Sequence, residues 1–242
     1  MISWRWLGIA ASIGLLVIMT LGQLIDKDLP KGSEGEAAEN LTNRIEQSIN
    51  KAAWDNTGIV TWTFAGGQHI WDRSRELHEY KRGDKRIQHS LKSRVGRVQH
   101  DGEWKAVGAG SRLEQKAWDS WINDSFWLNP LAKLRDDGVK RLSVDQNQLL
   151  VSYTAGGNTP GDSYLWTVNE DGRPSEWALW VSVIPIGGIS CTWEDWVQLR
   201  SGAWISTTHD WGGYTLRLTD VDGAETWSEL YDHDPFDGFK PD

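Results

Sequence analysis

The sequence predicts a mainly β (α+β) fold: one large antiparallel sheet, a half-barrel, that curls around a central helical insert. Three observations predict it. Short strand-like runs bounded by Gly, Asn and Asp recur about every ten residues. Apolar and polar residues alternate along the later runs. Residues 111–137 interrupt this pattern with helical spacing. The chain of 242 residues is long enough for one such domain behind an apolar N-terminal segment.

The N-terminal segment contains no charged side chain between residues 7 and 25. A helix over these residues would rise about 28 Å, close to the ~30 Å hydrocarbon core of a bilayer. We therefore expect residues 1–25 to form a transmembrane anchor in the inner membrane. Arg5 favours a cytoplasmic N-terminus, which places the body on the periplasmic side. The alternative is a signal peptide cleaved near Gly22, which would leave a secreted or periplasmic body.

Two segments separate the anchor from the first strand. Residues 26–40 are polar and rich in Gly and Glu, which is typical of a flexible linker. Leu41, Ile45 and Ile49 then recur at helical spacing, which predicts an amphipathic helix over residues 41–53. A mainly β, tryptophan-rich domain is expected over 41–231, and an acidic, loose tail over 232–242.

Strand-like runs with turn residues between them follow the helix. Those before the insert are 59–64, 68–72, 75–81, 85–91 and 94–100. Their spacing predicts an antiparallel meander. About six more strands are expected after the insert, where Leu149, Val151 and Tyr153 share one face.

The insert contains two helical segments. Ser111 and Glu114 have capping-box spacing, and Leu113, Ala117 and Trp121 recur at helical spacing. Asn129-Pro130 then begins a second short segment, which Gly138 ends.

The order of elements and the phrase Phe126-Trp127-Leu128-Asn129-Pro130 resemble the bacterial outer-membrane lipoprotein carrier superfamily (LolA/LolB-like) over about residues 40–225. The resemblance implies a half-barrel in which helices plug an apolar concavity that holds acyl chains. It carries no residue role across position by position. The chain also lacks the lipid-modified N-terminal cysteine of the receptor branch, because Cys191 is its only cysteine.

The candidate ligand-binding residues are apolar side chains of the insert and of two later strands. They are Trp118, Trp121, Phe126, Trp127, Leu131, Leu134, Trp166 and Trp193. As the wall of an apolar pocket they would bind an alkyl ligand; plain core packing is the alternative interpretation.

Four histidines fall in successive predicted strands: His69, His78, His89 and His100. Converging imidazoles are one way to build a metal site. The sequence lacks the short paired spacings that indicate one, so we predict no metal and leave open whether the rings converge.

Composition excludes several function classes. The formal net charge is −9, which argues against nucleic acid as a partner because phosphate binding needs clustered Lys and Arg. A single cysteine excludes an intrachain disulfide. We find no catalytic or cofactor motif, so neither catalytic residues nor a cofactor are predicted.

The sequence therefore favours a membrane-tethered, extracytoplasmic protein that binds an apolar ligand, such as the acyl part of a lipid or lipoprotein. One alternative is a carbohydrate-binding or glycoside-hydrolysing domain, since the chain has 17 tryptophans and the acidic pair Glu194 and Asp195. It would need a row of exposed tryptophans. The other alternative is a structural or assembly partner of an envelope complex, which would bind an envelope protein through a surface patch.

Overall fold

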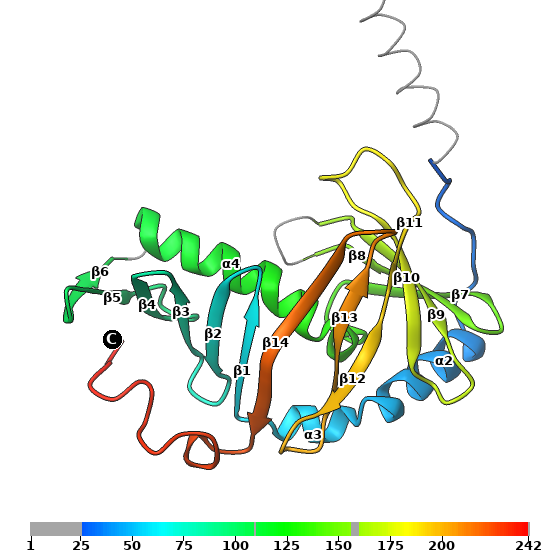
Figure 1. Cartoon of the computed structure of the whole chain (residues 1–242). Coiled ribbons are helices and arrows are strands. Elements are labelled where there is room, and N and C mark those ends of the chain that lie inside the picture. Colours follow the sequence, from blue (N-terminus) through cyan, green and yellow to red (C-terminus); the bar gives the residue numbers. More distant parts are fainter. Residues whose placement is uncertain (1–25, 109, 156–159, 242) are drawn as a thin grey trace, which may run out of the picture.

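The computed structural model of the chain describes residues 26–108, 110–155 and 160–241 (Figure 1). Within these residues the chain is mainly β, as the sequence predicts, and its strands form two antiparallel sheets of nine and five strands. The predicted membrane anchor, residues 1–25, lies outside the described residues. In the part that is described, every helix is too short or too polar to cross a bilayer.

The larger sheet has the strand order β12-β13-β14-β1-β2-β3-β4-β5-β6. Its strands are β1 (Ile59–Phe64), β2 (Gly67–Asp72), β3 (Leu77–Arg82), β4 (Lys85–Ser90), β5 (Gly96–His100), β6 (Glu103–Val107), β12 (Glu194–Gln198), β13 (Trp204–Asp210) and β14 (Thr215–Ala224). The five predicted runs before the insert match β1 to β5 closely. The sequence pattern missed β6, an edge strand in which no residue is buried.

The smaller sheet has the order β11-β10-β9-β8-β7. Its strands are β7 (Val139–Asp145), β8 (Gln148–Tyr153), β9 (Ser163–Val168), β10 (Pro174–Trp180) and β11 (Ile189–Thr192). All neighbouring pairs are antiparallel, and Trp166 lies opposite both Leu149 and Trp177.

The prediction of one continuous curled sheet was wrong, because the chain changes pairing partner at Trp193. The preceding strand, β11, pairs with β10, whereas β12 pairs with β13. The Trp193 side chain is buried between the two sheets, and its backbone N–H donates to the Ser175 carbonyl. Asp195, the second residue of β12, has a φ of 51°, in the left-handed region.

The N-terminal helical region forms two helices instead of one. Helix α2 (Glu36–Ser48) begins within the segment predicted as a linker, and α3 (Lys51–Asn56) follows it. Two acidic residues in the first turn of α2 complement the helix dipole, and Ala38 is buried. The helix therefore begins nearer the N-terminus than the predicted start at residue 41. Asn50 separates the helices because its φ is 51°, and its side chain caps α3.

The central insert is α4 (Arg112–Leu128) followed by a 3₁₀ turn, η1 (Pro130–Lys133), as predicted. Ser111 caps α4 by accepting the Glu114 backbone N–H at 3.3 Å. Only this half of the expected capping box forms, because the Glu114 carboxylate instead binds Arg94. Asn129 caps η1 through the Ala132 N–H at 3.2 Å.

Two large apolar clusters join these layers. The first fills the space between α2, η1 and the five-stranded sheet, and it contains Trp166, Trp177 and Trp193. The second lies on the nine-stranded sheet and contains Trp62 and Phe64. Trp127 of α4 packs against both clusters. The C-terminal end of α4 is therefore where the two halves of the domain meet.

Candidate functional site

The structure places the predicted pocket residues in three surroundings. Leu131, Leu134, Trp166 and Trp193 are buried inside the first apolar cluster. Phe126 and Trp127 are half-buried and pack on the outside of that cluster. The first four residues are therefore part of the core, whereas Phe126 and Trp127 keep partly accessible surface.

The remaining two lie elsewhere on α4. Trp121 packs edge-on against Trp71, with ring centroids 5.3 Å apart, in the second cluster. Trp118 is covered by the Arg94 guanidinium, whose carbon lies 3.8 Å from the ring centroid. These two indoles thus face the nine-stranded sheet, away from Trp166 and Trp193.

Phe126 and Trp127 each contact a further half-buried aromatic ring. Phe126 contacts Tyr153 of β8 at 5.4 Å between ring centroids, and Trp127 contacts Trp211 at 5.9 Å. Both central residues also contact the buried Trp177. We call Tyr153, Phe126, Trp127 and Trp211 the aromatic row.

The aromatic row connects the two sheets across the end of α4. Tyr153 comes from the five-stranded sheet and Trp211 from the hairpin between β13 and β14 of the nine-stranded sheet. Sequence reasoning identified the helical pair and missed the two outer residues. Tyr153 was recognised only as part of an alternating strand, and Trp211 lies beside a turn, where no periodicity marks it.

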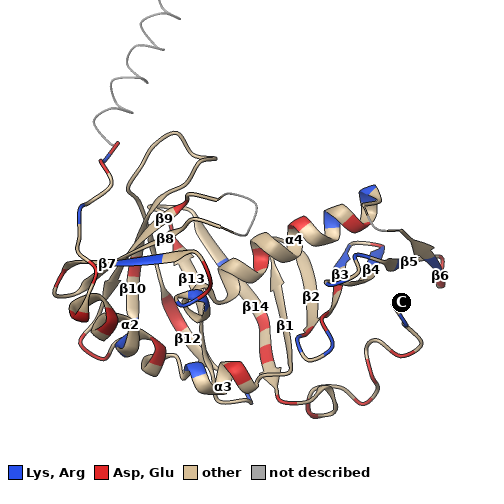
Figure 2. Ribbon diagram, turned by 180° about the vertical axis from the view of Figure 1, so that it is seen from behind, with Lys and Arg blue, Asp and Glu red and all other residues tan. Residues whose placement is uncertain are grey.

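The loop from 181 to 188 packs on the same cluster as the aromatic row. Its sequence, VSVIPIGG, has no charge, and Val181 and Ile184 contact the first cluster. Figure 2 shows it as an uncharged loop at one end of the domain, whereas acidic and basic residues are spread over the rest of the ribbon. Val183 is 74% exposed.

The described N-terminal residues lie beside this loop (Figure 1). The Lys27 N–H donates to the Gly187 carbonyl at 3.1 Å, and the Gly187 N–H donates to the Asp26 carboxylate at 2.7 Å. The Trp180 indole N–H donates to the Lys27 carbonyl at 2.6 Å. The chain therefore leaves the predicted anchor at the end of the domain that carries the apolar loop.

Three of the four strand histidines do converge. His78 lies opposite His89 in the β3–β4 pair, and His69 lies diagonally across from His78 on the same face of the sheet. The His69 Nδ1 and His78 Nε2 atoms are 3.0 Å apart, and the His78 Nδ1 and His89 Nε2 atoms are 2.8 Å apart. His100 is exposed at the end of β5 and pairs with Asp101.

Two carboxylates of α4 close the ends of this row of rings. Asp124 Oδ2 lies 3.0 Å from His69 Nε2, and Glu114 Oε1 lies 3.4 Å from His89 Nδ1. We call Asp124, His69, His78, His89 and Glu114 the histidine chain. All of them are buried.

Burial controls the charge of these groups. It lowers the pKa of His78 well below the ordinary value, and the neighbouring imidazoles lower it further. Burial also lowers the pKa of His89 to about 4, against the attraction of Glu114. Burial acts to raise the pKa of Glu114, but Arg94 and the Gly110 N–H bind its ionised form, so that the pKa is lowered on balance.

Metal binding is not favoured by this geometry. Each ring uses both of its nitrogens toward neighbouring side chains, so the lone pairs form a line and do not converge on one point. In the described ranges, no group of three or more His, Cys, Asp and Glu side chains is arranged to hold a metal ion.

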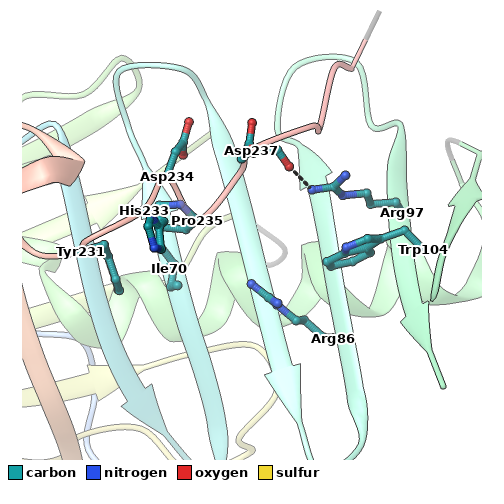
Figure 3. A pocket seen from close by; sticks show the side chains of 9 residues that line it. All are labelled: Ile70, Arg86, Arg97, Trp104, Tyr231, His233, Asp234, Pro235 and Asp237. Atoms are coloured by element: carbon teal, nitrogen blue, oxygen red, sulfur yellow. Dashed lines mark hydrogen bonds between the residues drawn. The ribbon is translucent and has the colours of Figure 1, made fainter. Parts of the chain in front are cut away.

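A surface pocket of about 370 Å³ lies on the opposite, outer face of the nine-stranded sheet (Figure 3). Arg86, Arg97 and Trp104 line one side, and the C-terminal segment lines the other. The Arg97 Nη2 donates to the Asp237 carbonyl at 2.8 Å. Arginine and aspartate in the lining suit a polar ligand and do not suit an alkyl chain.

The C-terminal tail that forms this pocket is docked, so the expectation of a loose tail was wrong. The Asp234 carboxylate accepts two hydrogen bonds from Arg75, at 2.7 and 2.8 Å, and Phe236 is buried. The Pro235 carbonyl accepts the Gln88 amide at 2.8 Å. Composition alone did not reveal these partners, because each of them lies more than a hundred residues earlier in the chain.

Comparison with known proteins identifies no family for the chain. No protein-family model matches it, and no curated protein matches its sequence. A solved structure, a DUF1329 family protein from Desulfovibrio piger, is similar with a TM-score of 0.37 and 8% identity, over 81% of this chain and 100% of that one. This is a weak similarity of fold, and no residue role is carried over from it.

Proposed function

We propose that this chain is a membrane-tethered protein whose body, on the periplasmic side, binds the acyl part of a lipid or lipoprotein. The observation that carries the proposal is the aromatic row. Four half-buried rings meet where α4 joins the two sheets, so apolar surface remains partly accessible there. An alkyl chain lying along the row would gain roughly 0.8 kcal/mol for each CH₂ group that it buries.

The apolar loop supports the same proposal. Residues 181–188 pack on the cluster behind the aromatic row and lie beside Asp26 and Lys27, which follow the predicted anchor. If residues 1–25 span the membrane, this end of the domain faces the bilayer. An acyl chain would then reach the row from the membrane by passing the loop.

The carbohydrate alternative lacks the platform that it requires. The exposed large apolar residues of the described chain are Leu29, Val183, Val197 and Tyr214, and none is a tryptophan. Glu194 and Asp195 are exposed, at the start of the edge strand β12. The assembly alternative needs an envelope protein as partner and would be favoured if no small ligand binds.

The test is a titration of residues 26–242, which include every helix and strand of the described chain, with fatty acids of several lengths and an acylated peptide. We expect saturable quenching of tryptophan emission, affinity that rises with chain length to a plateau, and a negative heat-capacity change of binding. Trp127→Asp should weaken binding at least tenfold, because it places a charge against the alkyl chain.

Matched variants separate the loop from a general loss of apolar surface. Val183→Asp should weaken binding several-fold, whereas Val197→Asp, the same change on β12, should leave it unchanged. An aspartate at Leu131 would report only on folding, since that side chain is 1% exposed. Absence of a saturable signal with every acyl ligand would refute the proposal; binding of a glycan instead would favour the carbohydrate class.

A further inference from the structure

The contacts of the histidine chain require more protons than three neutral imidazoles carry. Four contacts link its five groups: Asp124 to His69, His69 to His78, His78 to His89, and His89 to Glu114. Each hydrogen bond requires one proton between its two atoms. A neutral imidazole carries one N–H and one lone pair, so three neutral rings supply three protons.

With three protons, one of the four contacts is always unsatisfied, whether at an end of the chain or between two rings. If His69 donates to Asp124 and each following ring donates toward it, the lone pair of His89 faces the Glu114 carboxylate. If the direction is reversed, the lone pair of His69 faces Asp124. Either arrangement buries two acceptors against each other, which is unfavourable where water cannot intervene.

A fourth proton satisfies all four contacts. His69 would then donate from Nε2 to Asp124 and from Nδ1 to His78. His78 would donate from Nδ1 to His89, and His89 from Nδ1 to Glu114. His69 is also the ring with a suitable neighbour for a positive charge. The indole of Trp62 lies parallel to it, at 4.4 Å between centroids and an interplanar angle of 5°.

The charges around the chain balance with this proton in place. Asp124 and Glu114 each contribute a negative charge from α4, and Arg94 binds Glu114 from the turn between β4 and β5. An imidazolium at His69 is the one further positive charge required. Uncharged residues face the chain from the neighbouring strands: Trp62 from β1, Tyr80 from β3 and, opposite His89, Gly96 from β5.

We propose that the histidine chain is a buried binding site for one proton in addition to those of three neutral imidazoles, and that His69 holds it between Asp124 and His78. With this proton in place, unbroken hydrogen bonds link Asp124 and Glu114 of α4 to the three histidines of β2, β3 and β4. Its loss leaves a buried carboxylate facing a lone pair. The site stands on its own geometry and does not depend on the acyl ligand.

The test counts imidazole protons in the full-length protein, labelled with ¹⁵N in its histidines, at neutral pH. Ring nitrogens with and without a proton have distinct ¹⁵N shifts. We expect the three rings of the histidine chain to show four N–H groups, with both nitrogens of one ring protonated and one nitrogen of each of the others. A count of three would overturn the proposal.

Asp124→Asn is the decisive variant, because an amide can donate where a carboxylate cannot. The introduced side-chain amide donates to His69 Nε2, and the three ring protons then fill the remaining contacts in one direction. We expect the fourth N–H to disappear while the fold is kept. Asp119→Asn, an exposed change on the same helix, should leave four.

A charged ring that persists in the Asp124→Asn variant would contradict the assignment of the proton to His69. Should this variant fail to fold, the proton count in the unchanged protein decides the question by itself.

Discussion

Buried aromatic rings pack against one another in the core of this domain. Trp166 illustrates this: its exposed fraction is zero, and its ring lies 4.9 Å from Trp177 and 5.0 Å from Trp193, measured between centroids. Packed tryptophans contribute large buried area and favourable ring geometry together. Removing one leaves a cavity that the neighbouring rings cannot fill without moving.

We therefore expect Trp166→Ala to lower the free energy of unfolding by about 3–5 kcal/mol. Chemical denaturation followed by circular dichroism would measure the change. Trp104→Ala, a half-buried residue on the outer face, is the matched control and should cost less. A loss below about 1 kcal/mol at Trp166 would contradict its placement in the core.

The titration of His209 is a second residue-scale effect. Its ring is buried against Trp193, and burial lowers its pKa to about 4, although the Thr192 carbonyl opposes the shift. A free histidine has a pKa near 6.5. Between these values the unfolded chain binds a proton that the folded ring does not, so stability is complete above about pH 6.5 and falls as pH decreases toward 4.

The titration of His209 should accordingly lower the free energy of unfolding by about 2 kcal/mol as the pH falls from roughly 7 to 5. Denaturation curves at several pH values would show it as a slope that His209→Gln reduces. His100→Gln, a change at an exposed ring, should keep the slope of the unchanged protein. If the free energy of unfolding depends on pH equally steeply in His209→Gln and His100→Gln, the lowered pKa of His209 is contradicted.

At the scale of elements, the two ends of the described chain are attached to opposite parts of the domain. The N-terminal residues bond to the loop after β10, and the C-terminal segment crosses the outer face of β2 to β5. The interaction of Arg75 with Asp234 raises the pKa of the arginine and lowers that of the aspartate. The segment is therefore part of the folded unit.

Phe236 anchors this segment, because its side chain is 1% exposed. We expect Phe236→Ala to destabilise the protein by about 3 kcal/mol, as for other buried aromatic residues. It should also increase proteolysis after residue 231. Asp232→Ala, an exposed change in the same segment, should have neither effect, and a stable Phe236→Ala protein would mean that the tail is not docked in solution.

For the whole molecule, the anchor and the apolar loop predict one orientation. An uncharged stretch precedes residue 26, and the loop beside that residue is also uncharged. Both features predict that this end of the domain lies at a membrane. The acidic remainder, with a formal charge of −9 for the chain, would face solvent.

We expect the full-length protein to fractionate with membranes and to keep its first 25 residues. Alkaline washing should leave it in the membrane pellet, since a spanning helix is not removed by salt or pH. N-terminal sequencing of the native protein tests retention directly. A sequence that begins near Gln23 would show that the segment is cleaved.

Local sequence determined five of the six strands before the insert, the insert itself and the shared faces of the later strands. It did so because β-strands and helices impose periods of two and about 3.6 residues on apolar positions, and because turns need Gly, Asn or Asp. These signals also predicted that Phe126 and Trp127 belong to an apolar helical insert. They predicted the histidines in successive strands but not their register.

Only the tertiary structure decided which distant groups meet. The division into two sheets depends on a change of partner at Trp193, and the aromatic row needs Tyr153 and Trp211 from different sheets. The histidine chain required the registers of β2, β3 and β4 together with two carboxylates on a helix that follows them. Such contacts join residues far apart in sequence, so no local period records them.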